Sequence, residues 1–284
     1  MINNGVVQIL SLAQLSQGQD WRLFLSHDYQ SHLLIWITRG QGLLQLDGQR
    51  RGLGAHNAIF VPAGSLFSIE LGRQGFGQAV VIPDGAPLTL PHIPRHLRIR
   101  DVRAQSELTG LIEAAQREQQ APRSLSSQAL EAHAALMSVW LRRQIMQDEH
   151  VPDHISAGIR LSARFCKMVS ERFATGVPMA TYADVLGVTP THLTRAVKAA
   201  TGKTAADILT ERVVYEARDL LTTTEHSAQS IAQQLGFGSA AYFTRFVQQH
   251  TGRPPSKLRA ANQGLPLQGN APPRAVADVA DRIA

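Results

Sequence analysis

The segment Leu235–Pro255, LGFGSAAYFTRFVQQHTGRPP, repeats a pattern already written at Leu186–Thr204, LGVTPTHLTRAVKAATGKT. Leu193-Thr194-Arg195 in the first copy corresponds to Phe243-Thr244-Arg245 in the second. The offset between the copies is 49 residues before the turn and 50 after it, because the second turn is one residue longer. The chain therefore encodes the same short helical hairpin twice.

Each copy has the pattern of a helix-turn-helix motif: a short helix, a glycine turn and a second helix. Gly187 supplies the positive φ that a tight turn needs, and Thr189 followed by Pro190 is a typical start for the second helix. The second helices present side chains that can contact base edges, and arginine suits the O6 and N7 atoms of guanine. The predicted base contacts are Thr191, Thr194, Arg195, Ala240, Ala241, Thr244 and Arg245. Two such helices about 34 Å apart would read successive major grooves of one asymmetric site.

Contacts to the DNA phosphates are expected from helix N-termini and nearby cations. The predicted set is Ser230 and Ser239 as caps, with Lys198, Lys203 and Arg253 as charges. For each of these residues taken alone, simple exposure to solvent explains the sequence equally well. Arg212 lies four residues before Glu216, and this spacing favours a structural ion pair over a DNA contact.

The charge distribution also points to the C-terminal half. Residues 1–154 hold 13 Lys and Arg against 13 Asp and Glu, whereas residues 155–262 hold 13 against 7. The formal net charge of +6 therefore lies in the segment with the repeated hairpin. A basic domain beside a neutral one indicates a polyanionic partner, although a solvated basic surface would give the same count.

The first ~100 residues read as short strands separated by Gly, Pro and Asp, which predicts an antiparallel barrel or sandwich. The expected strands are Arg22–Leu25, Leu33–Thr38, Leu43–Asp47, Ala58–Val61, Leu66–Leu71 and Gly77–Ile82. Helices are expected at 106–120 and 126–147, and the second has an apolar stripe of Leu130, Ala134, Met137 and Leu141. The stripe could pair with a second chain in a homodimer or could cover the barrel.

These patterns divide the chain into four parts, and the fold class is α+β. We expect a sensor barrel at 1–104, a helical dimerisation and linker segment at 105–154, and an all-helical DNA-binding domain at 155–262. The remaining part, 263–284, is rich in Pro, Gly, Ala and Asp, a composition typical of disordered segments.

The C-terminal sequence resembles the AraC/XylS-type transcriptional regulators over roughly 158–261. The matching features of the second hairpin are Ile231-Ala232, Leu235–Phe237, Tyr242-Phe243, Arg245, Gly252 and Arg259. The resemblance implies a cupin-like effector or dimerisation domain before it, contact with RNA polymerase, and a role as activator. Two departures are Val197 and Val247 at positions where the family usually has Phe. Gln248 replaces the family's Lys, and Ala240 and Ala241 are small, so more base specificity is expected from the first hairpin.

The N-terminal half resembles a cupin that lacks its metal ligands. Gly54–Glu70 is similar to the second cupin motif, but Phe67 stands where a cupin enzyme has histidine. His27 and His32 are five residues apart and no Glu follows at the expected spacing, so neither a metal nor another cofactor is predicted. A small-molecule effector could contact His27, His32, Trp36, Phe60 and Phe67, while the same aromatic residues could simply fill the core.

The sequence thus favours a non-enzymatic DNA-binding regulator controlled by an effector. The alternatives are a cupin-type metalloenzyme fused to a helical interaction domain, and a DNA-binding protein without a ligand. The chain has no apolar run long enough to span a membrane, no signal-peptide pattern, and one cysteine, Cys166, expected to be buried in a helix. A cytoplasmic location is therefore expected.

Overall fold

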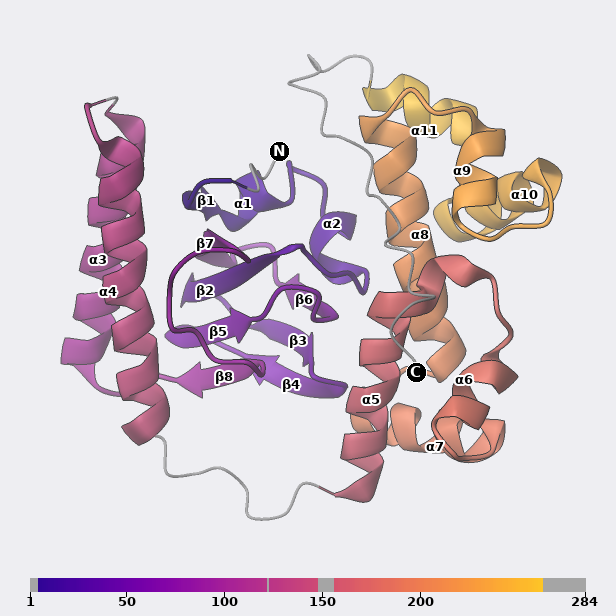
Figure 1. The fold of residues 1–284 in the computed structure, drawn as a ribbon, viewed down its shortest axis with the longest axis horizontal. Coiled ribbons are helices and arrows are strands. Elements are labelled where there is room, and N and C mark those ends of the chain that lie inside the picture. The colour runs from indigo at the N-terminus through magenta and orange to yellow at the C-terminus, as the bar shows by residue number, and fades with distance from the viewer. Residues whose placement is uncertain (1–4, 122, 148–155, 263–284) are drawn as a thin grey trace.

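The computed structural model describes residues 5–121, 123–147 and 156–262, and its fold is α+β (Figure 1). Two antiparallel sheets occupy the N-terminal half, with strand orders β1-β7-β2-β5-β8 and β4-β3-β6. The strands are β1 (Gln8–Ser11), β2 (Ser31–Arg39), β3 (Gly42–Leu46), β4 (Gln49–Leu53), β5 (Asn57–Val61), β6 (Phe67–Leu71), β7 (Phe76–Pro83) and β8 (Arg95–Arg98).

The two sheets pack face to face, so of the two predicted arrangements, barrel or sandwich, the structure has the sandwich. Ile35 and Val81 from the first sheet share one core with Leu44 and Phe67 from the second. Alternate residues of the long central strand β2 point to opposite faces, so Leu34 and Trp36 enter a different core on the outer side.

Helices α3 (Val102–Gln120) and α4 (Ser126–Gln147) cover that outer face. The apolar stripe of α4 is buried there together with Trp140, whose Nε1 donates to the Ala104 carbonyl oxygen at 3.0 Å. Of the two interpretations of this stripe, the structure confirms that it covers the strands of its own chain.

The sequence missed several polar strands and misassigned one segment. Arg22–Leu25 was expected as a strand, but Trp21–Phe24 forms a short helix, α2, after another short helix, α1 (Leu12–Leu15). Strands β1, β4 and β8 were not predicted, because QILS, QRRGL and RHLR show no clear apolar alternation.

The C-terminal half is all helical. Its elements are α5 (Ala157–Arg172), the 3₁₀ turn η1 (Phe173–Thr175), α6 (Met179–Val185), α7 (Pro190–Thr201), α8 (Ala205–Thr223), α9 (Ala228–Gln234), α10 (Ala240–Thr251) and α11 (Pro255–Asn262). The pairs α6–α7 and α9–α10 are two helix-turn-helix modules joined by the long helix α8 (Figure 1). Cys166 is buried in α5, and burial raises the pKa of its thiol to about 12.

Each module builds its own core. Leu193 and Val197 of α7 pack with Phe165 of α5, whereas Phe243 and Val247 of α10 pack with Leu221 of α8. Among the described helices, none has both the length and the apolar character that crossing a bilayer would require. The predicted disordered segment 263–284 lies outside the described residues.

Candidate nucleic-acid interface

Helix α7 starts as its sequence predicts. The Thr189 hydroxyl accepts a hydrogen bond from the His192 backbone N–H at 3.2 Å, and Pro190 occupies the first helical position. With Leu193 and Val197 turned into the core, Thr191 and Arg195 are exposed on the opposite side of the helix. Thr194 is half-buried at the border of that face.

Helix α10 repeats this geometry. The Ser239 hydroxyl accepts from the Tyr242 backbone N–H at 3.2 Å, and Phe243 and Val247 anchor the helix. Ala241 and Arg245 are exposed, while Ala240 and Thr244 are half-buried. The structure therefore brings the predicted base-contact residues of each module to one side of one helix, with an exposed arginine at the same register in both.

Both turns use a left-handed glycine, with φ of 72° at Gly187 and 74° at Gly236. The surroundings differ. A Cβ at Gly187 would meet no atom within 4 Å, whereas a Cβ at Gly236 would lie 2.6 Å from the Gly176 backbone nitrogen. The second turn is thus packed against the loop that leads into the first module.

The residues predicted to contact phosphates fall into different surroundings. Lys198 and Arg253 are exposed, and Ser239 caps α10 as expected. Ser230 does not cap α9: Ser227 does, and its hydroxyl accepts from the Ser230 backbone N–H at 3.1 Å. The reason is that α9 starts at Ala228, so Ser230 is already in its first turn.

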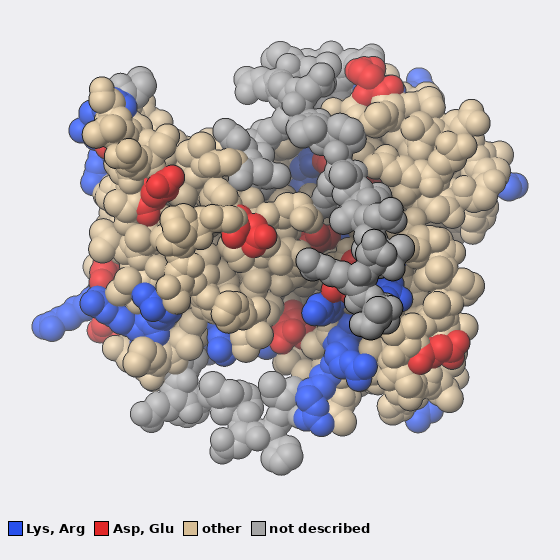
Figure 2. Space-filling model, viewed as in Figure 1, with Lys and Arg blue, Asp and Glu red and all other residues tan. Residues whose placement is uncertain are grey.

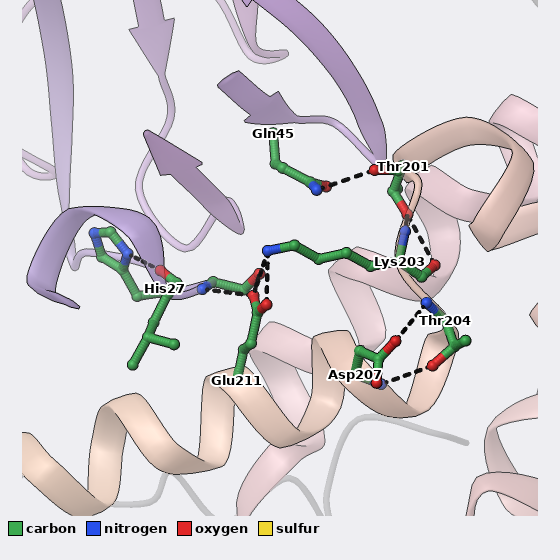
Figure 3. A network of polar contacts seen from close by, with 9 residues as sticks. His27, Gln45, Thr201, Lys203, Thr204, Asp207 and Glu211 are labelled. Carbon is green, nitrogen blue, oxygen red and sulfur yellow. Dashed lines mark hydrogen bonds and ion pairs between the residues drawn. The ribbon is translucent and has the colours of Figure 1, made fainter. Parts of the chain in front are cut away.

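Lys203 points toward Glu211 and the N-terminal domain, with its side chain 30% exposed (Figure 3). Its Nζ lies 2.6 Å from Glu211 Oε1, and the Ser26 hydroxyl donates to the other oxygen of this carboxylate at 2.7 Å. Beside it, Gln45 donates from Nε2 to the Thr201 carbonyl oxygen at 3.1 Å. In this arrangement the charge of Lys203 is compensated within the protein.

The centre of the domain contact is a buried ionic cluster around Arg212. Its Nε donates to Asp28 at 2.7 Å and its Nη1 donates to Glu216 at 2.8 Å, so the predicted pair with Glu216 is confirmed. The Arg212 side chain is 0% exposed, and its guanidinium lies over the Phe173 ring at 3.7 Å from the centroid. A buried charge of this kind is tolerated only when it is paired.

Aromatic rings and a second ion pair surround that cluster. His27 stacks on Tyr215 of α8 with ring centroids 4.5 Å apart, and burial lowers the pKa of His27 to about 4. Trp21 packs edge-on against the same Tyr215 at 5.3 Å. Arg22 donates to Asp219 at 2.5 Å. These contacts fasten α8, the helix between the two modules, to the N-terminal domain.

The five residues predicted to bind an effector do not surround one shared cavity. His27, at the domain contact, lies against Phe67 with ring centroids 4.4 Å apart, whereas Trp36 and Phe60 belong to the separate core under α3 and α4. His32 accepts from the Ala63 backbone N–H at 3.1 Å and lies 3.1 Å from Asp84. None of them lines the cleft of about 250 Å³ between β3, β6 and the α7–α8 turn.

No group of three or more His, Cys, Asp or Glu side chains converges as a metal site within the part of the chain that the structure describes. Sequence reasoning missed the domain contact altogether. Asp28 and Arg212 are 184 residues apart, and only the fold brings them together.

Residues 182–261 match the sequence model of a family described as "Helix-turn-helix domain". No curated protein matches the chain. Among solved structures, wild-type ToxT from Vibrio cholerae with an unsaturated fatty acid bound is 13% identical, with 92% of this chain and 96% of ToxT covered and a TM-score of 0.43.

Two shorter structures match a little over a third of the chain. The C-terminal domain of AraT, a response regulator from Geobacillus stearothermophilus, is 24% identical, with 38% of this chain and 88% of that domain covered and a TM-score of 0.35. The DNA-binding domain of AdpA in complex with a target DNA is 22% identical, with coverages of 37% and 98% and a TM-score of 0.34. With its glycine turns, capped second helices and connecting helix, the segment 182–261 is a helix-turn-helix domain.

Proposed function

We propose that the chain is a sequence-specific DNA-binding transcription regulator whose two modules read adjacent segments of one duplex. The observation that carries the proposal is the matched placement of Arg195 on α7 and Arg245 on α10, each exposed on a capped helix whose opposite side is anchored in a core. An arginine so held can donate two hydrogen bonds to guanine in the major groove.

The first module is the stronger reader in this proposal. Thr191 adds an exposed hydroxyl beside Arg195, and Lys198 adds an exposed cation one turn further along the helix. The second module has Ala241 at the position of Thr191 in the first, and Gln248 in place of Lys198. It therefore has fewer groups that can form hydrogen bonds to bases or neutralise phosphates.

Selection from a pool of random duplexes tests this function directly. The full chain should enrich an asymmetric site with two conserved segments whose centres are about 10 base pairs apart, the spacing of successive major grooves. Recovery of no common sequence after repeated rounds, with binding that remains equal for all duplexes, would refute sequence-specific recognition.

Control by a small effector, activation through RNA polymerase and a cytoplasmic location are further parts of the proposal. Asp28 and Arg22 of the N-terminal domain form ion pairs with Arg212 and Asp219 of α8. A ligand that shifts this domain would therefore move the helix between the modules. Reporter transcription from a promoter carrying the selected site tests the sign of regulation: the deletion strain should express less than the wild type if the protein is an activator.

Homodimerisation is proposed through the outer side of α4. Its apolar stripe is used inside the chain, but Leu136 and Met146 remain on the outside, 53% and 81% exposed. Light scattering should give twice the chain mass for the wild type and a lower mass for Leu136→Glu. A wild-type monomer at micromolar concentration would contradict the dimer while leaving DNA recognition untouched.

A further inference from the structure

One rim of the sandwich carries a group of arginines that the proposed recognition helices do not use. Strands β4 and β8 are edge strands of their sheets, and they lie beside each other (Figure 1). Arg50 and Arg51 are on β4, Arg98 ends β8, and Arg100 follows it. These four residues are called the arginine rim below.

The surroundings of His96 show that the two edges adjoin. His96 is on β8, with its Nε2 2.7 Å from the Asn57 side-chain oxygen. Burial lowers the pKa of His96 to about 4, and the positive charges of Arg51 and Arg98 contribute to this lowering. One of these arginines comes from each sheet, so charges from both edges act on the same imidazole.

The arginine rim continues into the first helix-turn-helix module. Arg50 reaches the turn after α7, where its Nη1 would lie 3.4 Å from a Cβ built on Gly202. Next to it, the Ser162 hydroxyl of α5 donates to the Gly48 carbonyl oxygen at 2.7 Å, with both groups buried. The rim is thus fixed against the module that carries Arg195.

The rim has a surplus of positive charge. Arg50, Arg98 and Arg100 are exposed, and none forms an ion pair within the described ranges. Figure 2 shows Lys and Arg gathered along the lower part of one face, below the strands and at α5.

Three acidic residues lie along the same stretch. Asp47 acts on Arg51, Glu70 shares a cleft with Arg50, and Asp101 accepts from the Ala104 backbone N–H to cap α3. Among the described residues, Arg98 and Arg100 have no ion pair and share no cleft with an acidic side chain. Their positive charge therefore remains available to a partner.

We propose that the arginine rim binds the phosphate backbone of the duplex that flanks the segment read by α7. This inference rests on the proposed function and extends the footprint onto the N-terminal domain. A duplex is the partner that fits, because it carries one negative charge per about 1.7 Å and already lies against the adjoining module. The contact adds affinity and no base specificity, since arginine bound to phosphate reads no sequence.

Salt titrations on duplexes of different length test the proposal with the full chain. The duplex is the selected site, blunt-ended, or extended by about 15 base pairs of arbitrary sequence on one end or the other. The variant is Arg50→Gln/Arg98→Gln/Arg100→Gln. The matched control is Arg73→Gln, an exposed arginine in the β6–β7 turn outside the rim.

The expected result is asymmetric. One end of the site adjoins the segment whose base preference is lost in Arg195→Ala. Extension on that end should steepen the slope of log K against log salt by about 2–3, or about 0.9 for each phosphate neutralised. Extension on the other end should change nothing. The triple variant should lose this gain and keep its slope on the blunt-ended site, while Arg73→Gln should behave like wild type.

Three outcomes would overturn the arginine rim as a duplex contact. In the first, the wild type has the same salt slope on all three duplexes. In the second, the triple variant keeps the steeper slope on the extended duplex. In the third, the triple variant loses as much slope on the blunt-ended site as on the extended one. Preferential binding of a single-stranded RNA of the same length by the wild type, lost in the triple variant, would assign the rim to a different partner. Failure of the wild type and of both variants to bind the blunt-ended site selectively would instead refute the proposed function itself.

Discussion

In the proposed function, Arg195 is the residue on which base recognition most depends. It is exposed on α7, and its neighbours Leu193 and Val197 anchor the helix in the core. One bidentate contact to guanine is worth about 1–3 kcal/mol of discrimination between bases. Arg195→Ala should therefore weaken binding to the selected site by that amount and leave binding to random DNA nearly unchanged. Titrations of both duplexes at one salt concentration measure this, with Arg245→Ala expected to have the smaller effect. Equal loss on the two duplexes would reduce Arg195 to a phosphate contact.

Arg212 contributes to the stability of the folded protein. Arg212→Met would leave the carboxylates of Asp28 and Glu216 buried without their shared cation, and breaking a buried pair in this way costs about 3–5 kcal/mol. Lys167→Met is the control, because it removes only the exposed 4.0 Å pair with Glu171, worth at most about 1 kcal/mol. Urea unfolding at neutral pH compares them. Similar unfolding midpoints for the two variants would show that the buried cluster contributes no more than a surface pair.

His27 should make the stability depend on pH. Its pKa is about 4 in the folded chain, where desolvation is the main cause, and about 6.5 when unfolded. The unfolded state therefore takes up the proton first, and stability falls as pH drops from about 6.5 to 4, by about 3 kcal/mol for this group.

The test replaces the imidazole without removing the ring that stacks on Tyr215. His27→Phe should flatten the pH dependence of unfolding between pH 6.5 and 4, although His96, also with a pKa of about 4, keeps part of the slope. His192→Phe changes an exposed histidine and should leave the profile unaltered. An unchanged profile in His27→Phe would contradict the buried neutral imidazole.

At the scale of elements, the two turn glycines form a natural comparison. Gly187 and Gly236 have nearly the same positive φ, so an alanine costs about 1–2 kcal/mol at either position. Only at Gly236 would the new methyl group also collide with backbone, at Gly176 and Ala174. Gly236→Ala should therefore lower the unfolding midpoint more than Gly187→Ala and speed hydrogen exchange in α9 and α10. Equal effects of the two substitutions would show that the close packing is relieved at little cost.

The elements also show what a single sequence can and cannot predict. Thr189, Pro190 and the glycine turns specify the modules locally, and the apolar stripe of α4 specifies a covered helix. Arg22–Leu25 was misread because a short apolar run fits a strand or a helix equally well, and tertiary contacts decide between them. The sequence predicts the cap of α9 three residues too late, since Ser227 and Ser230 are both suitable cap residues.

At the scale of the whole molecule, the sequence could not predict the domain contact. Arg22 meets Asp219 and Asp28 meets Arg212 across almost two hundred residues, and no local pattern marks such pairs. The same limit applies to Lys203, which was expected to face DNA and is paired with Glu211 beside the N-terminal domain. Local signals predict the two recognition helices, but only the fold shows which of the nearby cations are already paired within the protein.

The arrangement of the two modules on α8 leads to the most direct test. If α7 and α10 read one duplex from the same side, then inserting about 5 base pairs between the two segments of the selected site moves them half a turn apart, and inserting about 10 restores the common side. A competition titration should show affinity near the non-specific level for the insertion of 5 and a partial recovery for the insertion of 10. Undiminished binding to the site with 5 inserted base pairs would contradict reading of one duplex by two fixed helices.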